Sequence, residues 1–190
     1  MKVIGFIPAK GHSNRLKGKN IYPLLGKPLI HWTLEAAKKS KYLNDIFVST
    51  DSDKVKDCIS EFDINIIDRP KELSKDNAHK QQVLEHAIKY IELKHAKVDL
   101  ICMLQANSPQ IQTNKIDEAI EKVLNKENTV FECQSINKNS LITDGAIRVF
   151  RKQCLDNRGL GMYLSAVLTD YVDVHTINDI KYLEEILCTK

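Results

Sequence analysis

The sequence lacks several features that would assign the protein to a class at once. No Asp or Glu precedes Glu35, no C-x-x-C pair occurs among the five cysteines, and the aromatic residues make up only 6% of the chain. No apolar run approaches the ~18 residues that a membrane span needs. These absences argue against a disulfide framework, a structural zinc site, a membrane-spanning protein and a nucleic-acid binder that stacks bases on aromatic side chains.

The rest of the composition is that of an ordinary globular protein. Hydrophobic residues account for 43% and charged residues for 28% of 190 residues, with a formal net charge of +3. This balance excludes a disordered chain and does not indicate a nucleic-acid partner. The opening apolar run, residues 3–9, does not fit a secretory signal, and an odd number of cysteines fits a reducing compartment. We therefore expect one domain over residues 1–190, soluble and cytoplasmic, with no membrane partner.

The charge is unevenly distributed, because the first 34 residues carry only positive charge. The cationic residues there are Lys2, Lys10, Arg15, Lys17, Lys19 and Lys27. Four of these fall in residues 10–20, which we call the basic loop and which directly follow an apolar run. Gly11 and Gly18 would let backbone amides approach anionic oxygens, and the cations would add charge-assisted hydrogen bonds. A phosphate-binding loop and an ordinary solvated turn are the two interpretations.

The basic loop is not a standard nucleotide-binding motif. In a P-loop alignment Gly18 and Lys19 match, but Ser13 replaces the first glycine and Asn20 replaces the hydroxyl residue that would hold Mg²⁺. The G-x-G-x-x-G pattern of dinucleotide folds is also absent. The loop chemistry therefore favours phosphate binding without naming the nucleotide.

Short apolar runs alternate with segments of helical periodicity. Strands are predicted over residues 3–8, 45–50, 64–67, 98–105, 129–135, 146–150 and 162–168. Helices are predicted over residues 30–37, 55–62, 83–91, 116–123 and 180–187. This alternation predicts βαβ units in an α/β protein with a mainly parallel, doubly wound sheet. The least patterned part is residues 131–145.

Sheets of this kind bind ligands outside the carboxyl ends of their strands. The places selected by that rule are residues 10–20, 49–53 and 105–109 and the turns near Asp144 and Asp173. Asp51 and Asp53 follow a strand and precede a helix, so we interpret both as helix caps. Five histidines show no metal-ligand spacing, and we interpret them as surface or core residues: His12, His31, His79, His86 and His95.

Several motifs, taken in order along the chain, resemble those of the acylneuraminate cytidylyltransferases, which make CMP-sialic acid and related CMP-sugars. The segment IPAKGHSNRLKGKNIYPLLGKPLIHWTLEAA is similar to that family's signature. Further similar segments are VSTD (48–51), RPKELSKDNA (69–78), LQANSP (104–109), DGAIRVF (144–150) and YVDVHTINDI (171–180). The resemblance covers nearly the whole chain.

The resemblance implies a three-layer α/β/α sandwich of the nucleotide-diphospho-sugar transferase type. It implies a nucleotidyltransferase that transfers CMP from CTP to the anomeric hydroxyl of a 2-keto-3-deoxy acid sugar, releasing pyrophosphate in glycan biosynthesis. The acceptor would be of the sialic, legionaminic, pseudaminic or KDO type, and the cofactor Mg²⁺, with Mn²⁺ as the alternative. Two other hypotheses are an enzyme of this fold with another base or acceptor, and a nucleotide-binding protein without turnover.

The resemblance also implies roles for individual residues. Lys10, Lys19 and Asp173 are the expected catalytic residues. The expected nucleotide-binding residues are Lys10, Gly11, Ser13, Arg15, Lys19, Asn20, Arg69 and Asp76. Gln105 matches a residue near the acceptor sugar, and Asp173 and His175 align with a pair of metal-binding aspartates. Asp76 has a second interpretation, as the cap of the helix that follows it.

Two residues and one segment depart from the family pattern. Lys10 stands in place of an arginine, which exchanges a bidentate fork for a point charge. His175 replaces the second metal-binding aspartate, and imidazole suits Mn²⁺ or Zn²⁺ better than Mg²⁺. Residues 129–145 form a shorter segment than in the family, where this segment carries the part that dimerises the enzyme. A homodimer stays possible, with its usual interface reduced.

Overall fold

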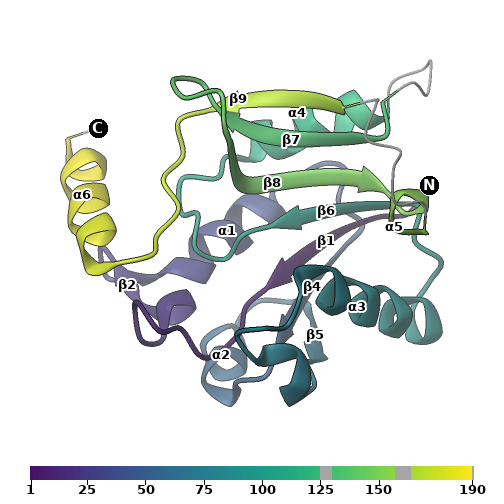
Figure 1. Ribbon diagram of the computed structural model, residues 1–190, viewed down its shortest axis with the longest axis horizontal. Coiled ribbons are helices and arrows are strands. Elements are labelled where there is room, and N and C mark those ends of the chain that lie inside the picture. Colours follow the sequence, from purple (N-terminus) through teal and green to yellow (C-terminus); the bar gives the residue numbers. More distant parts are fainter. Residues whose placement is uncertain (125–129, 157–163, 190) are drawn as a thin grey trace.

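The computed structural model of the protein describes residues 1–124, 130–156 and 164–189. These residues form a seven-stranded sheet with the strand order β5-β4-β1-β6-β8-β7-β9 and a separate two-stranded hairpin (Figure 1). β8 pairs antiparallel with both of its neighbours, whereas every other pair in the large sheet is parallel. The mainly parallel sheet that the sequence predicts is therefore confirmed.

The elements follow the predicted alternation. The strands of the large sheet are β1 (Val3–Pro8), β4 (Asp45–Thr50), β5 (Asn65–Asp68), β6 (Leu100–Leu104), β7 (Glu132–Asn137), β8 (Thr143–Arg151) and β9 (Leu164–Thr169), and the hairpin is β2 (Pro23–Leu24) with β3 (Lys27–Pro28). The helices are α1 (Leu29–Lys38), α2 (Asp53–Cys58), α3 (Lys80–Lys94), α4 (Thr113–Val123), α5 (Gln153–Asp156) and α6 (Ile177–Cys188), with short 3₁₀ helices η1 (Lys19–Ile21) and η2 (Lys71–Ser74).

Helices cover both faces of the sheet because its strands are apolar on both faces. In β1, Val3 and Ile7 pack with residues of α1, α2 and α4, whereas Ile4 and Phe6 pack with α3. This alternation is the two-residue period of a strand, and burial on both faces explains why the run reads as continuously apolar. The three-layer α/β/α sandwich is thus confirmed. A third cluster packs α6 against Leu16 and the β2–β3 hairpin, so α6 supports the basic loop from outside the sheet.

Several boundaries differ from the predictions. The periodicity of residues 55–62 predicts a helix, but α2 ends at Cys58, and the chain then turns with the Ser60 hydroxyl donating to the Asp57 carbonyl. Ile59 is nevertheless fully buried, which is why the apolar period continues past the helix. The predicted strands over 129–135 and 162–168 correspond to β7 and β9, and residues 129, 162 and 163 lie outside the described residues.

The segment expected to be shortened forms a simple structure. From residue 130 to 145 the chain contains β7, a turn and the start of β8. That this segment is shorter than in the family stays a prediction, and so does the homodimer whose interface it would form. The single domain over 1–190 also stays a prediction. All five cysteines are free, as expected. No helix of the described residues is long and apolar enough to cross a bilayer.

Candidate active site

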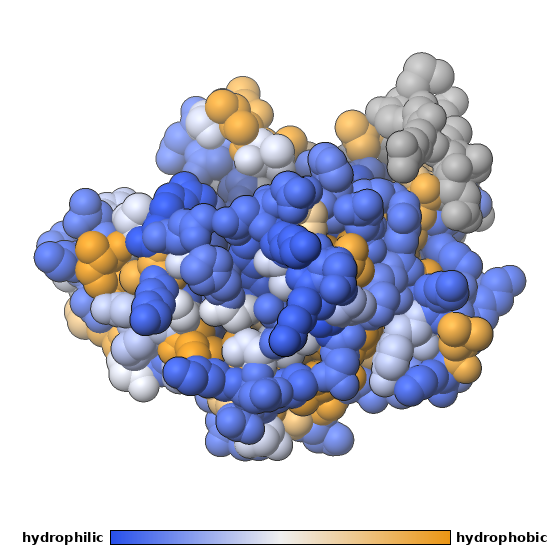
Figure 2. All heavy atoms as spheres, turned by 60° about the horizontal axis from the view of Figure 1, so that its bottom comes forward, coloured by the Kyte–Doolittle hydropathy of each residue, from blue (hydrophilic) through white to orange (hydrophobic). Residues whose placement is uncertain are grey.

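A cavity of about 350 Å³ lies at the carboxyl edge of β1 and β6 and is closed on one side by the basic loop. The surface on the side of α2, β5 and α3 is covered mostly by hydrophilic residues (Figure 2). Of the residues predicted to form the site, those in the cavity wall are Lys10, Ser13, Arg15, Lys19, Asn20, Arg69, Asp76 and Gln105. Segments from three parts of the chain thus meet where the sheet topology predicts a ligand site.

The base of the basic loop is fixed by the segment that follows β4. The Gly11 amide donates a hydrogen bond of 2.9 Å to the Asp51 carboxylate. A Cβ atom on Gly11 would lie 2.4 Å from Cβ of Ser52, so a side chain at this position cannot be accommodated without moving backbone. Asn20, which is buried, donates from its amide to the Lys10 carbonyl at 2.9 Å and closes the loop.

The interpretation of Asp51 and Asp53 as helix caps is wrong. Ser52 occupies the N-cap position of α2, and Asp53 is the first helical residue, bonded to Lys56. Asp51 instead accepts the Gly11 amide, which lies 40 positions away. The Gly11 amide is therefore already bonded to a carboxylate. The contribution of Gly11 to the loop is its lack of a side chain, which lets the backbone approach Ser52 closely.

We expect the Asp51→Ala variant to bind CTP about 10-fold more weakly than the natural protein, because a partly buried amide loses its acceptor and the loop loses its anchor. The Asp51→Asn variant keeps an oxygen in the same place and should bind CTP within about twofold of the natural protein. Isothermal titration calorimetry with CTP measures both. Equal weakening in the two variants would show that the charge of Asp51, and not its hydrogen bond, matters.

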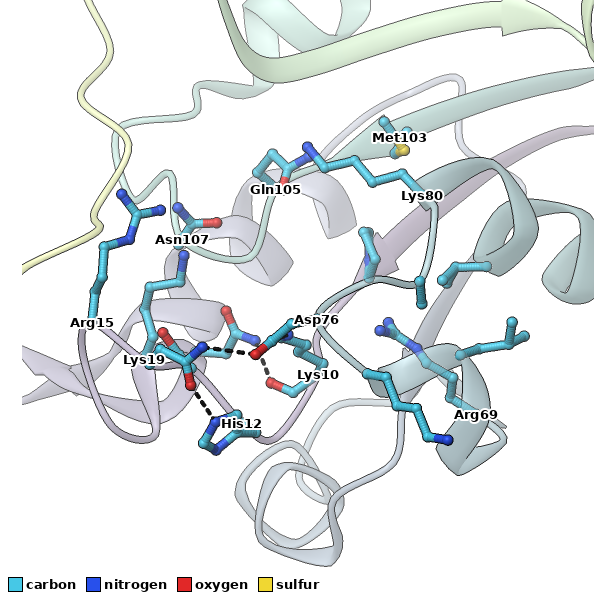
Figure 3. Close-up of a pocket in the computed structure, with 18 of the residues that line it drawn as sticks. Lys10, His12, Arg15, Lys19, Arg69, Asp76, Lys80, Met103, Gln105 and Asn107 are labelled. Atoms are coloured by element: carbon cyan, nitrogen blue, oxygen red, sulfur yellow. Dashed lines mark hydrogen bonds and ion pairs between the residues drawn. The ribbon is translucent and has the colours of Figure 1, made fainter.

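One cation of the loop is held by the only carboxylate in the described cavity wall. Lys10 Nζ lies 2.6 Å from Asp76 Oδ1, and Asn14 donates to Asp76 Oδ2 at 2.7 Å (Figure 3). The hydrogen bond from Lys10, followed by that from Asn14, holds the pKa of Asp76 below its usual value. His79, and not Asp76, is the N-cap of α3, so the capping interpretation of Asp76 is also wrong. Its contact with a nucleotide stays a prediction.

Arg69 forms part of the cavity wall from a buried position after β5. It is 7% exposed, and its guanidinium donates to the Ser49 carbonyl at 2.6 Å and to the Ser49 hydroxyl at 3.1 Å. Burial lowers the pKa of Arg69, and the nearby Asp51 carboxylate opposes this effect. A guanidinium nevertheless stays charged in proteins, so Arg69 places a fixed positive charge beneath the cavity.

Lys19, in the basic loop, interacts electrostatically with Asp173, in the segment that precedes α6. Lys19 follows Gly18, whose φ of 65° is in the left-handed region that glycine adopts without strain, and begins η1. Burial lowers the pKa of the Lys19 ammonium, with Asp173 acting in the opposite direction. Burial raises the pKa of the Asp173 carboxyl, although the buried Ser108 hydroxyl donates to it.

The segment that carries Asp173 is tied to the loop after β6. Asn107 donates from its side-chain amide to the Val174 carbonyl at 2.9 Å, and the Val174 amide donates to the Asn107 carbonyl at 2.9 Å. Ser108 reaches Asp173 from the same loop. These bonds hold the Asp173 carboxylate beside the cavity, although Asp173 and His175 are not among the described residues that line it.

The predicted metal ligands differ in their surroundings. Nδ1 of His175 lies 3.2 Å from a guanidinium nitrogen of Arg15, and burial, with Lys19 and Arg15 adding to it, lowers the pKa of His175. The described residues contain no group of three His, Cys, Asp or Glu that could hold a metal ion. A single carboxylate fits Mg²⁺ or Mn²⁺ where substrate phosphates supply the other oxygens. Asp173 is the carboxylate that would meet that requirement, whereas ligation by Nδ1 of His175 would need Arg15 to move; the metal roles of both residues stay predictions.

Sequence reasoning missed several residues of the cavity wall. Lys80, at the start of α3, extends into the cavity, and Asn107, His12 and Asn14 also line it (Figure 3). Asn107 lies in the LQANSP segment, so its motif was a usable signal. Lys80 lies two residues after the RPKELSKDNA segment and outside it, and only the position of α3 relative to β6 reveals it.

Comparison with known proteins identifies the family. The family model described as cytidylyltransferase matches residues 4–180. The mitochondrial 3-deoxy-manno-octulosonate cytidylyltransferase of Arabidopsis thaliana is 29% identical over 184 residues, which cover 96% of this chain and 60% of that protein. The pseudaminic acid cytidylyltransferase of Campylobacter jejuni is 31% identical over 128 residues, 67% of this chain and 55% of that protein. The chain thus matches less than two thirds of the length of either relative.

Solved structures share the fold. A CMP:2-keto-3-deoxy-manno-octonic acid synthetase complexed with CTP superimposes with a TM-score of 0.79 at 16% identity, covering 100% of this chain and 99% of that one. The Rv0371c protein of Mycobacterium tuberculosis, in complex with manganese, has a TM-score of 0.69 at 14% identity, covering 97% and 99%. With a family model spanning residues 4–180, the chain belongs to the cytidylyltransferase family.

Proposed function

We propose that the protein transfers CMP from CTP to the anomeric hydroxyl of a 2-keto-3-deoxy acid sugar and releases pyrophosphate. The observation that carries this proposal is the cationic cavity at the carboxyl edge of the sheet in a chain of the cytidylyltransferase family. Two relatives bear the names of acidic-sugar cytidylyltransferases with different acceptors, which supports the class of acceptor and leaves the particular sugar open.

In this proposal the basic loop binds the triphosphate. Lys10, Arg15 and Lys19 lie along one wall, and a triphosphate would replace Asp76 as the partner of Lys10. Such a reaction needs little covalent chemistry from the protein, since positioning and stabilisation of developing charge supply most of the rate. Arg69 and Asp76 would bind the cytidine part of the nucleotide, and Gln105, on the opposite wall, would bind the acceptor.

We assign a divalent cation to Asp173, beside this cavity. Asp173, with Ser108 holding its carboxylate, would bind Mg²⁺ or Mn²⁺ together with phosphate oxygens of the substrate. When bound, the ion would neutralise charge on those oxygens. The protein's own groups would then act on the rest of the reactants, with Lys19 facing the pyrophosphate side and Gln105 orienting the acceptor.

We expect pyrophosphate release with CTP, a divalent cation and one member of a panel of acid sugars that includes 3-deoxy-manno-octulosonic, N-acetylneuraminic, legionaminic and pseudaminic acids. Each NTP is incubated with each acid in Mg²⁺ or Mn²⁺, and a coupled pyrophosphate assay follows the rate. The rate with CTP should exceed that with UTP, ATP or GTP by more than about 10-fold, as expected when a site hydrogen-bonds one base selectively.

The same panel separates the alternatives. Faster turnover with another NTP would assign the chain to a nucleotidyltransferase with a different base. CTP binding by calorimetry without pyrophosphate release for any acid would indicate a nucleotide-binding protein without turnover. No affinity for any nucleotide would contradict the proposal and both alternatives.

A further inference from the structure

The cations that line the cavity differ in whether they already have a partner. Lys10 is paired with Asp76, Arg15 contacts His175, and Arg69 is bonded to Ser49. Among the described residues, no carboxylate lies within ion-pair distance of the three remaining lysines of the wall, which are Lys19, Lys75 and Lys80. Unpaired cations in a cavity favour an anionic ligand.

These three lysines occupy different parts of the wall. Lys19 belongs to the basic loop, and Lys75 directly precedes Asp76, so both lie with residues proposed to bind the nucleotide. Lys80 comes from α3 on the other side. Its side chain extends across the cavity toward Gln105, at the end of β6, and away from Lys10 and Asp76 (Figure 3).

Lys80 also contributes to the electrostatics of the proposed reaction centre. The charges of Lys19 and Lys80 both interact with the Asp173 carboxylate. Lys80 therefore lies within electrostatic range of Asp173, as Lys19 does. The cavity wall that holds Lys19 and Gln105 thus also carries a cation from a separate element, α3.

The position of Lys80 in its helix is locally unfavourable. It is the first residue of α3, where the helix dipole is positive and disfavours a cation, and the first turn holds no acidic residue to compensate. Local choices that oppose stability in this way concentrate at functional sites. The lysine at this position is therefore explained by the cavity better than by the helix.

We propose that Lys80 binds the carboxylate of the acidic acceptor sugar and so determines the preference for acids. The inference rests on the proposed function and extends it, because the triphosphate is assigned to the basic loop and the acceptor carboxylate needs a cation on the side of Gln105. A lysine provides a charge-assisted hydrogen bond to a carboxylate, while Gln105 offers an amide for the hydroxyl groups of the sugar.

The test uses Lys80→Met and Lys80→Arg. We expect Lys80→Met to raise the KM for the acid sugar by about 10-fold or more, as loss of a charge-assisted bond predicts, with the Kd for CTP unchanged within about twofold. Lys80→Arg should restore most of the acceptor affinity. Lys89→Met, which removes the same charge from an exposed position on the same helix, is the matched control and should behave like the natural protein.

Three results would overturn the inference. A weaker Kd for CTP with an unchanged acceptor KM in Lys80→Met would assign Lys80 to the triphosphate, and unchanged values of both would remove it from either role. Binding of each of the four acids of the panel to the CTP-loaded protein, measured by calorimetry without divalent metal, is a second readout. Failure of the natural protein to bind any of the four acids is the third result that contradicts the inference. Failure of the natural protein to bind CTP, in contrast, contradicts the proposed function itself.

Discussion

The Lys19→Ala variant is expected to lose more than about 10-fold in kcat/KM for pyrophosphate release while keeping its fold. The half-buried ammonium of Lys19 has no ion-pair partner among the described residues. Burial lowers its pKa, Asp173 opposes this effect, and Arg15, Lys80 and Lys10 lower the pKa further. A lowered pKa means that the charged ammonium is less favourable in the folded protein than in the unfolded chain, so removing it should not decrease stability. A bound triphosphate would stabilise that charge.

Steady-state kinetics with CTP and an active acceptor, together with thermal unfolding, test this expectation. Lys17→Ala is the matched control, because Lys17 belongs to the same loop, is exposed and is not part of the cavity wall. A near-normal kcat/KM in Lys19→Ala would show that the basic loop does not serve the transferred phosphate. A large fall in the midpoint of unfolding would show that Lys19 is structural.

The sheet and the location of the site could be predicted because they depend on patterns within single segments. The run at residues 3–8 is apolar at consecutive positions, which indicates a strand covered on both faces, and the structure buries it that way. Once parallel strands are predicted, their carboxyl ends must lie at one edge. The basic loop and residues 105–109 therefore come together without any knowledge of the contacts between them.

The contacts inside the site could not be predicted, because they join residues far apart in sequence. Asp51 has the local chemistry of a helix cap, and the choice of the Gly11 amide depends on how closely Gly11 approaches Ser52. Asp76 also precedes a helix, yet it pairs with Lys10, 66 positions away. In both cases a tertiary contact replaced a local one that the sequence favoured.

Lys80 and the end of α2 illustrate two other limits. Lys80 lies just outside the RPKELSKDNA motif, so its place in the cavity wall could not be predicted without the placement of α3 beside β6. In α2 the apolar period extends to Phe62, but the helix ends at Cys58, because a turn at residues 59–62 buries the same side chains. Periodicity reports which residues are buried, and it does not by itself specify the backbone that buries them.

The Asp173→Asn variant is expected to lose about 100-fold or more in turnover, the magnitude found when one group that stabilises transition-state charge is removed. Asp173 is the carboxylate proposed to hold the divalent cation, and it interacts electrostatically with Lys19 of the basic loop. The amide cannot balance the charge of the cation, so the Mn²⁺ or Mg²⁺ concentration for half-maximal rate should also rise. Kinetics over a titration of each metal measure both effects.

The same substitution should not destabilise the protein, and this separates a functional role from a structural one. Burial raises the pKa of Asp173 in the folded state. Protonated Asp173 therefore contributes to the stability of the fold below the ordinary carboxyl pKa, and this contribution is lost as the pH rises through the higher folded pKa. At neutral pH the ionised carboxylate therefore opposes folding, whereas the side-chain amide of the variant would be uncharged and would still accept the Ser108 hydroxyl. We expect the midpoint of unfolding at pH 7 to be equal to or above that of the natural protein.

Asp170→Asn, outside the cavity wall, is the control, and a large loss of stability in Asp173→Asn alone would assign Asp173 to structure.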